Sequence, residues 1–295
     1  MQPLLKLGIL YVMKTIFETF KKSIYNPVFY HTVASEPLGS IFRYYSKVTL
    51  ILSALMTAGL GILLVPAGVS FLKERAPEMV RSYYPAELVV TIEKGEVAIN
   101  MPEPYIISGK GDTLVALKKQ GLENIFVIDT KRNFEKVKFD EYKTFALLTK
   151  TEIVTRSDSG QITIQELRRM PATTISQEFL LSWVEKVRGK LGYIVFGGVI
   201  AAFVAITLGY MVYLVPLLLF ALIPFFIAWL KKTPLSYGGA YRMSLYAILP
   251  ALALKTLLNL FGVFFLPAYF TLLVFMLIIA LNMKEVEQQN LFENK

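Results

Sequence analysis

A single lysine, Lys255, interrupts the apolar stretch AILPALALKTLLNLF, which covers residues 247–261. A charged side chain within membrane hydrocarbon is costly, so such a residue usually has a function. Three interpretations are open: the ammonium extends to the headgroups, faces the interior of a helix bundle, or binds an anion. Asn259 follows one helical turn later on the same face, so the two side chains are expected to share a polar cluster.

The bundle interior offers Lys255 further acceptors. Pro250 cannot donate a backbone hydrogen bond, which leaves the carbonyl of Tyr246 without its usual partner. Tyr241 and Arg242, in the preceding stretch SYGGAYR, are two more candidates for a polar or ligand-binding site in the bundle.

The sequence carries few groups suited to catalysis or metal binding. It has one histidine, His31, and no cysteine, whereas a zinc site needs several such ligands. No carboxylate lies between Leu191 and Lys284, although proton-coupled transport and intramembrane aspartyl proteolysis usually rely on one. The stretch SGKGDT lacks the spacing of a phosphate-binding loop. We therefore expect no enzyme activity, no metal and no cofactor.

Asp129 and Thr130 form a candidate site outside the apolar segments. They end the stretch NIFVIDT, which is typical of a short buried strand. An aspartate at that position often accepts hydrogen bonds from the turn backbone, and ligand binding is the alternative role. Asp140 and Asp158 show no paired-acid spacing with them.

Apolar blocks predict a multi-spanning α-helical membrane protein with about five crossings. One crossing needs about 20 apolar residues. The first block holds one crossing, the second holds two that turn near residues 207–213, and the last holds two that turn near residues 259–263. The expected parts are an amphipathic N-terminal segment (1–47), the first transmembrane helix (48–72), an inserted domain (73–190), a four-helix transmembrane bundle (191–283) and a polar tail (284–295).

The inserted domain is expected to be α+β with mainly antiparallel strands. AELVVTIEKGEVAIN alternates apolar and polar residues around a Lys-Gly turn, which indicates a hairpin. A second hairpin is predicted around residues 157–160. The inserted domain has roughly 115 residues, which are enough for a separate core.

Charge predicts the orientation and argues against nucleic acid as a partner. The formal charge is +9, but residues 73–190 are nearly balanced, so the excess lies beside apolar segments. Residues 1–47 carry a net +4, which favours a cytoplasmic N-terminus and an extracytoplasmic 73–190 domain. With five crossings, however, the basic loop 231–242 falls outside, against the same rule. Membrane lipids and another membrane protein are the expected partners.

Several motifs together resemble a bacterial membrane family called domain of unknown function 1189. They are FKKSIYNPVFY (20–30), FVIDT (126–130), FALLTKTEIVTRSDSGQITIQEL (145–167) and PLSYGGAYRMSLYAILPALAL (234–254). The last motif is also similar to the Yip-type membrane domain. The family includes a membrane protein of maltodextrin-utilisation operons. The resemblance therefore implies a location in the bacterial cytoplasmic membrane and an accessory role, with no catalytic residues to carry over.

Three functions remain open from the sequence. The first is a non-enzymatic accessory or scaffolding protein, linked to sugar uptake or to envelope processes. The alternative is a transporter or channel subunit in which Lys255 binds an anion or lines a pathway. The third, which the lack of catalytic motifs disfavours, is an enzyme that acts on lipid or envelope polymer through carboxylates of the 73–190 domain.

Overall fold

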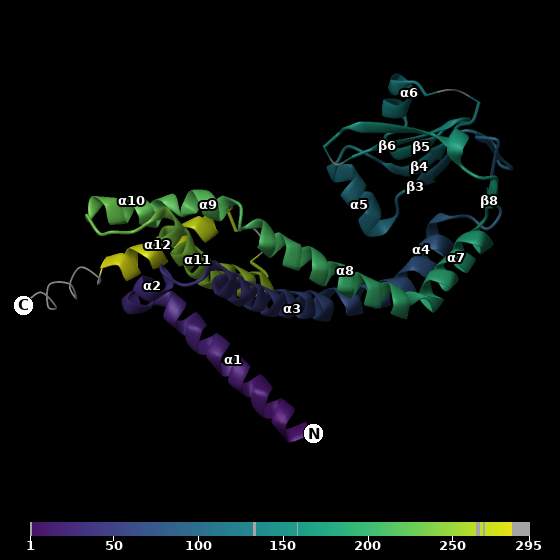
Figure 1. The fold of residues 1–295 in the computed structure, drawn as a ribbon. Coiled ribbons are helices and arrows are strands. Elements are labelled where there is room, and N and C mark those ends of the chain that lie inside the picture. Colours follow the sequence, from purple (N-terminus) through teal and green to yellow (C-terminus); the bar gives the residue numbers. More distant parts are fainter. Residues whose placement is uncertain (1, 132–133, 158, 264–265, 268, 285–295) are drawn as a thin grey trace, which may run out of the picture. The chain divides into compact units, whose positions relative to one another are not determined.

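The chain folds into two compact units in a computed structural model that describes residues 2–131, 134–157, 159–263, 266–267 and 269–284 (Figure 1). The helical unit comprises residues 1–65 and 195–295, and the sheet unit comprises residues 66–194. Asp158 and, after Lys284, the expected polar tail lie outside the described residues.

Eight helices are described in the helical unit, of which two continue into the sheet unit. They are α1 (Gln2–Ile24), α2 (Pro27–Val33), α3 (Leu38–Ser70), α8 (Leu191–Val212), α9 (Pro216–Phe220), α10 (Leu222–Leu230), α11 (Tyr237–Leu260) and α12 (Phe270–Lys284). Asn26 and Ser236 are the N-caps of α2 and α11, and their side chains accept from Phe29 N and Gly239 N.

Among the described residues, three helical stretches are long and apolar enough to cross a membrane, namely Leu38–Tyr83, Leu191–Leu230 and Tyr237–Leu260, and α12 is a shorter apolar helix. The expectation of a mostly helical chain with membrane-compatible segments is therefore confirmed. Five crossings are not confirmed. In the 191–230 block, helix α8 ends at Val212 because Pro216 has no N–H to donate to the Val212 carbonyl.

Helix α11 is the centre of the helical unit. Its residues from Met243 to Leu252 are all buried, and they pack against α2, α3 and α12 through side chains such as Tyr30, Tyr45 and Phe275. None of the residues described in α8 is buried. This strongly apolar helix is thus an outer one in the isolated chain, as expected where lipid or another apolar helix covers it.

The sheet unit contains two sheets and several short helices. One sheet has the order β2-β1-β8 and the other β3-β4-β5-β6-β7. The strands are β1 (Val90–Glu93), β2 (Glu96–Ile99), β3 (Tyr105–Ser108), β4 (Asn124–Ile128), β5 (Thr144–Leu148), β6 (Glu152–Arg156), β7 (Ile162–Glu166) and β8 (Thr173–Ile175). The helical elements are η1 (Phe71–Arg75), α4 (Ala76–Tyr83), α5 (Gly111–Lys119), α6 (Lys136–Glu141), η2 (Leu167–Arg169) and α7 (Gln177–Gly189).

Antiparallel pairing predominates in the sheets, as the alternating sequence predicts. The exception is β4–β5, which pair in parallel and are joined by a crossover that contains α6. The β1–β2 hairpin turns at Lys94 and Gly95, whose φ angles are +51° and +82°. Two consecutive residues with positive φ match the right-handed twist of the strands, which explains the Lys-Gly signal.

Candidate functional site

Lys255 is half-buried and interacts with Tyr213, at the break between α8 and α9. Its ammonium Nζ lies 3.2 Å from the Tyr213 hydroxyl and donates a hydrogen bond to it. The same Nζ is 5.9 Å from the centre of the Tyr213 ring. The phenol oxygen therefore provides an acceptor for the charge. Sequence reasoning did not identify Tyr213, because its contact with α11 depends on the position of the helix break.

Tyrosine side chains also join the region around the break between α8 and α9 to helices α3 and α11. The Tyr45 hydroxyl donates to the Tyr210 carbonyl at 2.7 Å, and the Tyr210 and Thr256 hydroxyls are hydrogen-bonded to each other. The Tyr241 hydroxyl donates to the Leu214 carbonyl at 3.4 Å. Such bonds satisfy carbonyls that a broken helix leaves without regular partners.

Asn259 does not form the expected cluster with Lys255. Its Oδ1 is buried and has no hydrogen-bond partner among the residues described. The four candidates on α11 thus do not form one site, because Arg242 and Lys255 are 13 residues apart, or about 20 Å along a helix.

Arg242 connects the start of α11 to the end of α2. Its Nη1 donates to the Ala34 carbonyl at 3.0 Å, while its Nε is buried without a partner among the described residues. A guanidinium is favourable there because helix carbonyls at a C-terminus carry partial negative charge. Gly239 favours this close approach, since a Cβ at that position would lie 3.3 Å from the Ala34 oxygen, which is tighter than most such contacts.

Asn282 connects the end of α12 to the N-terminal segment. Its side chain is fully buried, and its Oδ1 accepts from Asn26 N at 2.7 Å. Its Nδ2 donates to the carbonyls of Ile24 at 3.0 Å and Ile278 at 2.8 Å. A polar residue inside the apolar run FMLIIALNMK is the same signal that singled out Lys255, so Asn282 could have been found by it.

A cavity of about 310 Å³ lies where these segments meet. The polar lining comes from α2 and the short segment after it, from the α10–α11 loop and from α12. These residues are His31, Ser35, Lys231, Thr233, Ser236 and Asn282. The Lys231 ammonium donates to the Met283 carbonyl at 3.2 Å, which holds it at the wall. Two residues of this cavity, His31 and Lys231, are basic, and none of the described lining residues is a carboxylate.

Asp129 and Thr130 have structural partners at the end of β4. Asp129 Oδ1 accepts from Lys131 N at 3.3 Å, and its Oδ2 accepts from the Tyr142 hydroxyl at 2.8 Å. Thr130 donates to the Glu103 carboxylate through both its backbone N and its Oγ1. These bonds agree with the turn-stabilising role, and Tyr142 and Glu103 are the partners that the sequence did not indicate.

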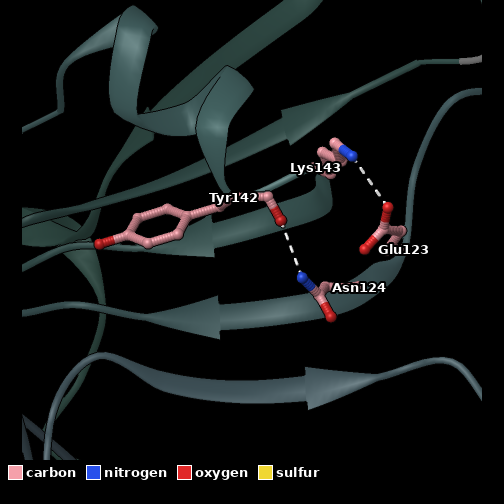
Figure 2. Close-up of polar contacts among 4 residues, drawn as sticks. All are labelled: Glu123, Asn124, Tyr142 and Lys143. Atoms are coloured by element: carbon pink, nitrogen blue, oxygen red, sulfur yellow. Dashed lines mark hydrogen bonds and ion pairs between the residues drawn. The ribbon is translucent and has the colours of Figure 1, made fainter.

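The start of β4 is tied to the residues before β5 (Figure 2). Asn124 Nδ2 donates to the Tyr142 carbonyl at 2.8 Å, and the Lys143 ammonium lies 2.9 Å from Glu123 Oε1. Lys143 has φ +43°, a conformation that these neighbouring contacts hold in place. Both ends of the parallel β4–β5 pair are thus secured by side chains, because no tight turn joins these strands.

The ion pair predicts a pH-dependent contribution to the stability of the sheet unit. The hydrogen bond and charge of Lys143 hold the pKa of Glu123 below its ordinary value. The pair therefore stabilises the fold above that ordinary value, and this contribution is lost as the pH falls through the lowered pKa. In Lys143→Met, NMR titration of the Glu123 carboxyl should show a higher pKa than in the unchanged chain. An identical titration curve would contradict the assignment.

The contact between Lys255 and Tyr213 predicts matched losses of stability. Lys255→Met and Tyr213→Phe should each lower the free energy of unfolding in detergent by about 1–2 kcal/mol, as expected for a charge-assisted hydrogen bond. The double variant should lose little more than either single variant. Strictly additive losses would show that the two side chains act independently.

A family model described as "Protein of unknown function (DUF1189)" matches residues 17–283. No curated protein and no solved structure matches the chain.

Proposed function

We propose that this chain, which belongs to the DUF1189 family of proteins of unknown function, is a non-enzymatic accessory protein that crosses the membrane four times. The proposed crossings are α3, the α8–α10 segment, α11 and α12. The N-terminus is then cytoplasmic and the sheet unit extracytoplasmic.

The order of contacts along α11 carries this proposal. Tyr210 contacts Thr256, Leu214 contacts Tyr241, and the Leu218 carbonyl accepts from the Tyr237 hydroxyl at 2.6 Å. As the chain advances from Tyr210 to Leu218, the residue that each position contacts on α11 moves back toward the start of that helix, from Thr256 to Tyr237. This pattern supports a single antiparallel passage of residues 191–230 beside α11, whereas a hairpin near residues 207–213 would reverse direction.

The return of α12 supports the fourth crossing. Helix α11 has 24 residues and is therefore about 36 Å long. Its start contacts the α2 end through Arg242 and Ala34, and Asn282 contacts the same N-terminal segment through Asn26. Residues 261–282 must therefore lead the chain back along the whole length of α11.

Four crossings also remove the charge conflict of a five-crossing arrangement. The basic residues Lys231, Lys232 and Arg242 come to the same side as the N-terminal segment, whose net charge is +4. Positively charged loops are enriched on the cytoplasmic side, so all of these charges agree with one orientation.

Cysteine labelling tests the topology directly, because the chain has no native cysteine. Pro234→Cys should resist a membrane-impermeant maleimide in intact cells and react after lysis, like the control Ser35→Cys. A second control, Gln165→Cys in β7, should react in intact cells. Labelling of Pro234→Cys in intact cells would refute four crossings and favour five.

The accessory role implies contact with another membrane protein, and the exposed apolar surface of α8 is the support for it. Phe196 and Leu208 are 68% and 60% exposed in the isolated chain. A photoreactive residue at Leu208 should give a discrete protein adduct in native membranes, unlike one at the loop residue Lys232. Adducts with lipid alone would remove the support for a partner on this face.

The hydrogen bond from Lys255 to Tyr213 favours an anchoring role for Lys255 over a role in a transport pathway. A sugar-uptake connection enters only through the resemblance to members of maltodextrin operons. Lys255→Met is therefore expected to leave uptake of maltodextrin by intact cells unchanged. Loss of that uptake at normal protein levels would favour the transporter alternative.

A further inference from the structure

A second cavity of the helical unit, with a volume of about 300 Å³, lies between α1 and the start of α3. Its lining includes Ile16 and Thr19 of α1 and Ser40, Arg43, Tyr44 and Lys47 of α3. We propose that this cavity binds the phosphate headgroup of an anionic phospholipid. The proposal rests on the crossing of the membrane by α3, which arrangements with four and five crossings have in common, and on no other part of the proposed function.

A hydrogen bond joins the two helices that form the walls of this cavity. The Tyr44 hydroxyl of α3 donates to the Ile16 carbonyl of α1 at 3.3 Å, and both residues line the cavity. The two helices lead away from α2 in different directions (Figure 1). Because both walls belong to one compact unit and are tied to each other, little ordering is required when a headgroup binds.

Arg43 and Lys47 supply the positive charge of the site. They are four residues apart on α3, so their side chains lie on the same face of the helix. Arg43 Nε donates to the Gly39 carbonyl at 3.2 Å, whereas its Nη1 and Nη2 donate to none of the described residues and can bind a phosphate in a bidentate manner. Lys47 is exposed and forms no hydrogen bond or ion pair with any residue that the structure describes. Both charges can therefore bind an anion without breaking an existing ion pair.

Hydroxyl groups complete the polar lining. Ser40 Oγ donates to the Pro37 carbonyl at 2.7 Å, so its lone pairs can accept from a hydroxyl of a headgroup such as phosphoglycerol. Thr19, on the α1 wall, brings a hydroxyl that can donate to a phosphate oxygen. None of the described lining residues is a carboxylate, so the charge of the cavity favours an anion over a cation.

Exposed apolar side chains next to the cavity favour a lipid over a free phosphate compound. Leu50 and Ile51 follow Lys47 by three and four residues, so they continue the same face of α3, and they are 43% and 36% exposed. Lys47 is also the last charged residue before the uncharged run of residues 48–72. A headgroup at Arg43 and Lys47 thus places its acyl chains along Leu50 and Ile51. Basic pockets between membrane helices bind anionic headgroups in this way.

Lipid binding is measured on the full chain after delipidation in neutral detergent. The probes are phosphatidylglycerol and phosphatidylcholine with identical acyl chains, and native mass spectrometry gives the dissociation constant of each. Phosphatidylglycerol is expected to bind at least about tenfold more tightly, the effect of one charge-assisted hydrogen bond. Inorganic phosphate, followed by thermal shift, is expected to bind far more weakly than phosphatidylglycerol because it buries no apolar surface.

Paired variants decide whether the cavity is responsible for the preference. Arg43→Gln and Lys47→Gln should each weaken phosphatidylglycerol binding about tenfold and leave phosphatidylcholine binding unchanged. Lys21 follows Thr19 by two residues and therefore lies on another side of α1. Lys21→Gln removes an equal charge there and should change binding less than about twofold, because salt screens an exposed charge. Lys47→Arg should retain most of the binding, which separates loss of charge from misfolding.

Three results would overturn the proposal. The first is equal affinity for the two lipids. The second is equal weakening by Lys47→Gln and Lys21→Gln, which would show only nonspecific attraction to a basic surface. The third is an affinity for inorganic phosphate that matches the affinity for phosphatidylglycerol, which would identify a free anion as the ligand. None of these results affects the number of crossings, which the cysteine experiment measures separately.

Discussion

Asn282→Leu is expected to lower the free energy of unfolding of the helical unit by about 2–4 kcal/mol. The substitution keeps the size of the side chain but removes three hydrogen bonds. The Ile278 carbonyl lies within helix α12, where the backbone still supplies a donor. Asn26 N and Ile24 O, in contrast, lose the Asn282 side chain as their partner. Each of these two groups then bears part of its desolvation cost, because the region is partly buried.

Asn259→Leu provides the matched control on the neighbouring helix. Asn259 Oδ1 is already buried without a partner among the described residues, so leucine should leave stability unchanged or raise it. Denaturant titrations in detergent can follow Trp229 alone in a Trp183→Phe background, since Trp229 belongs to the helical unit. Equal losses from the two substitutions would mean that the bonds of Asn282 contribute nothing specific.

Gly95→Ala is expected to destabilise the sheet unit by about 2–4 kcal/mol, the sum of backbone strain and overpacking. Gly95 has φ +82°, where a Cβ is unfavourable. A Cβ there would also lie 2.7 Å from the Arg168 Cα, a backbone atom that cannot move without shifting η2. The β1–β2 hairpin and η2 would therefore have to separate.

Gly121→Ala serves as a control that measures the backbone strain of a positive φ angle without the close contact present at Gly95. Gly121 has φ +74°, but a Cβ at this position would have no atom of the described residues within 4 Å. Only the backbone cost of about 1–2 kcal/mol therefore applies. Trp183 in a Trp229→Phe background reports unfolding of the sheet unit. If both alanine variants lost the same stability, close packing at Gly95 would not be the cause.

The sequence by itself determined which segments are apolar, where the β1–β2 hairpin turns, and that an α+β unit is inserted between membrane-compatible helices. These features follow from local patterns, namely composition over about 20 residues, alternation along strands and the conformational freedom of glycine. The bond from Lys131 N to Asp129 Oδ1 is of the same local kind, whereas the bond from the Tyr142 hydroxyl to Oδ2 depends on the fold.

The tertiary structure decided the direction of the α8–α10 segment and the partners of the polar side chains. Lys255 donates its hydrogen bond to Tyr213 and not to Asn259, and the cavity of about 310 Å³ is lined by both His31 and Lys231, which lie far apart in the sequence. An apolar block carries no signal of whether it turns back, because either arrangement buries the same surface. The two arrangements are distinguished by the order in which tyrosine hydroxyls of α11 pair with carbonyls of residues 214–218. That order depends on contacts between distant segments of the chain.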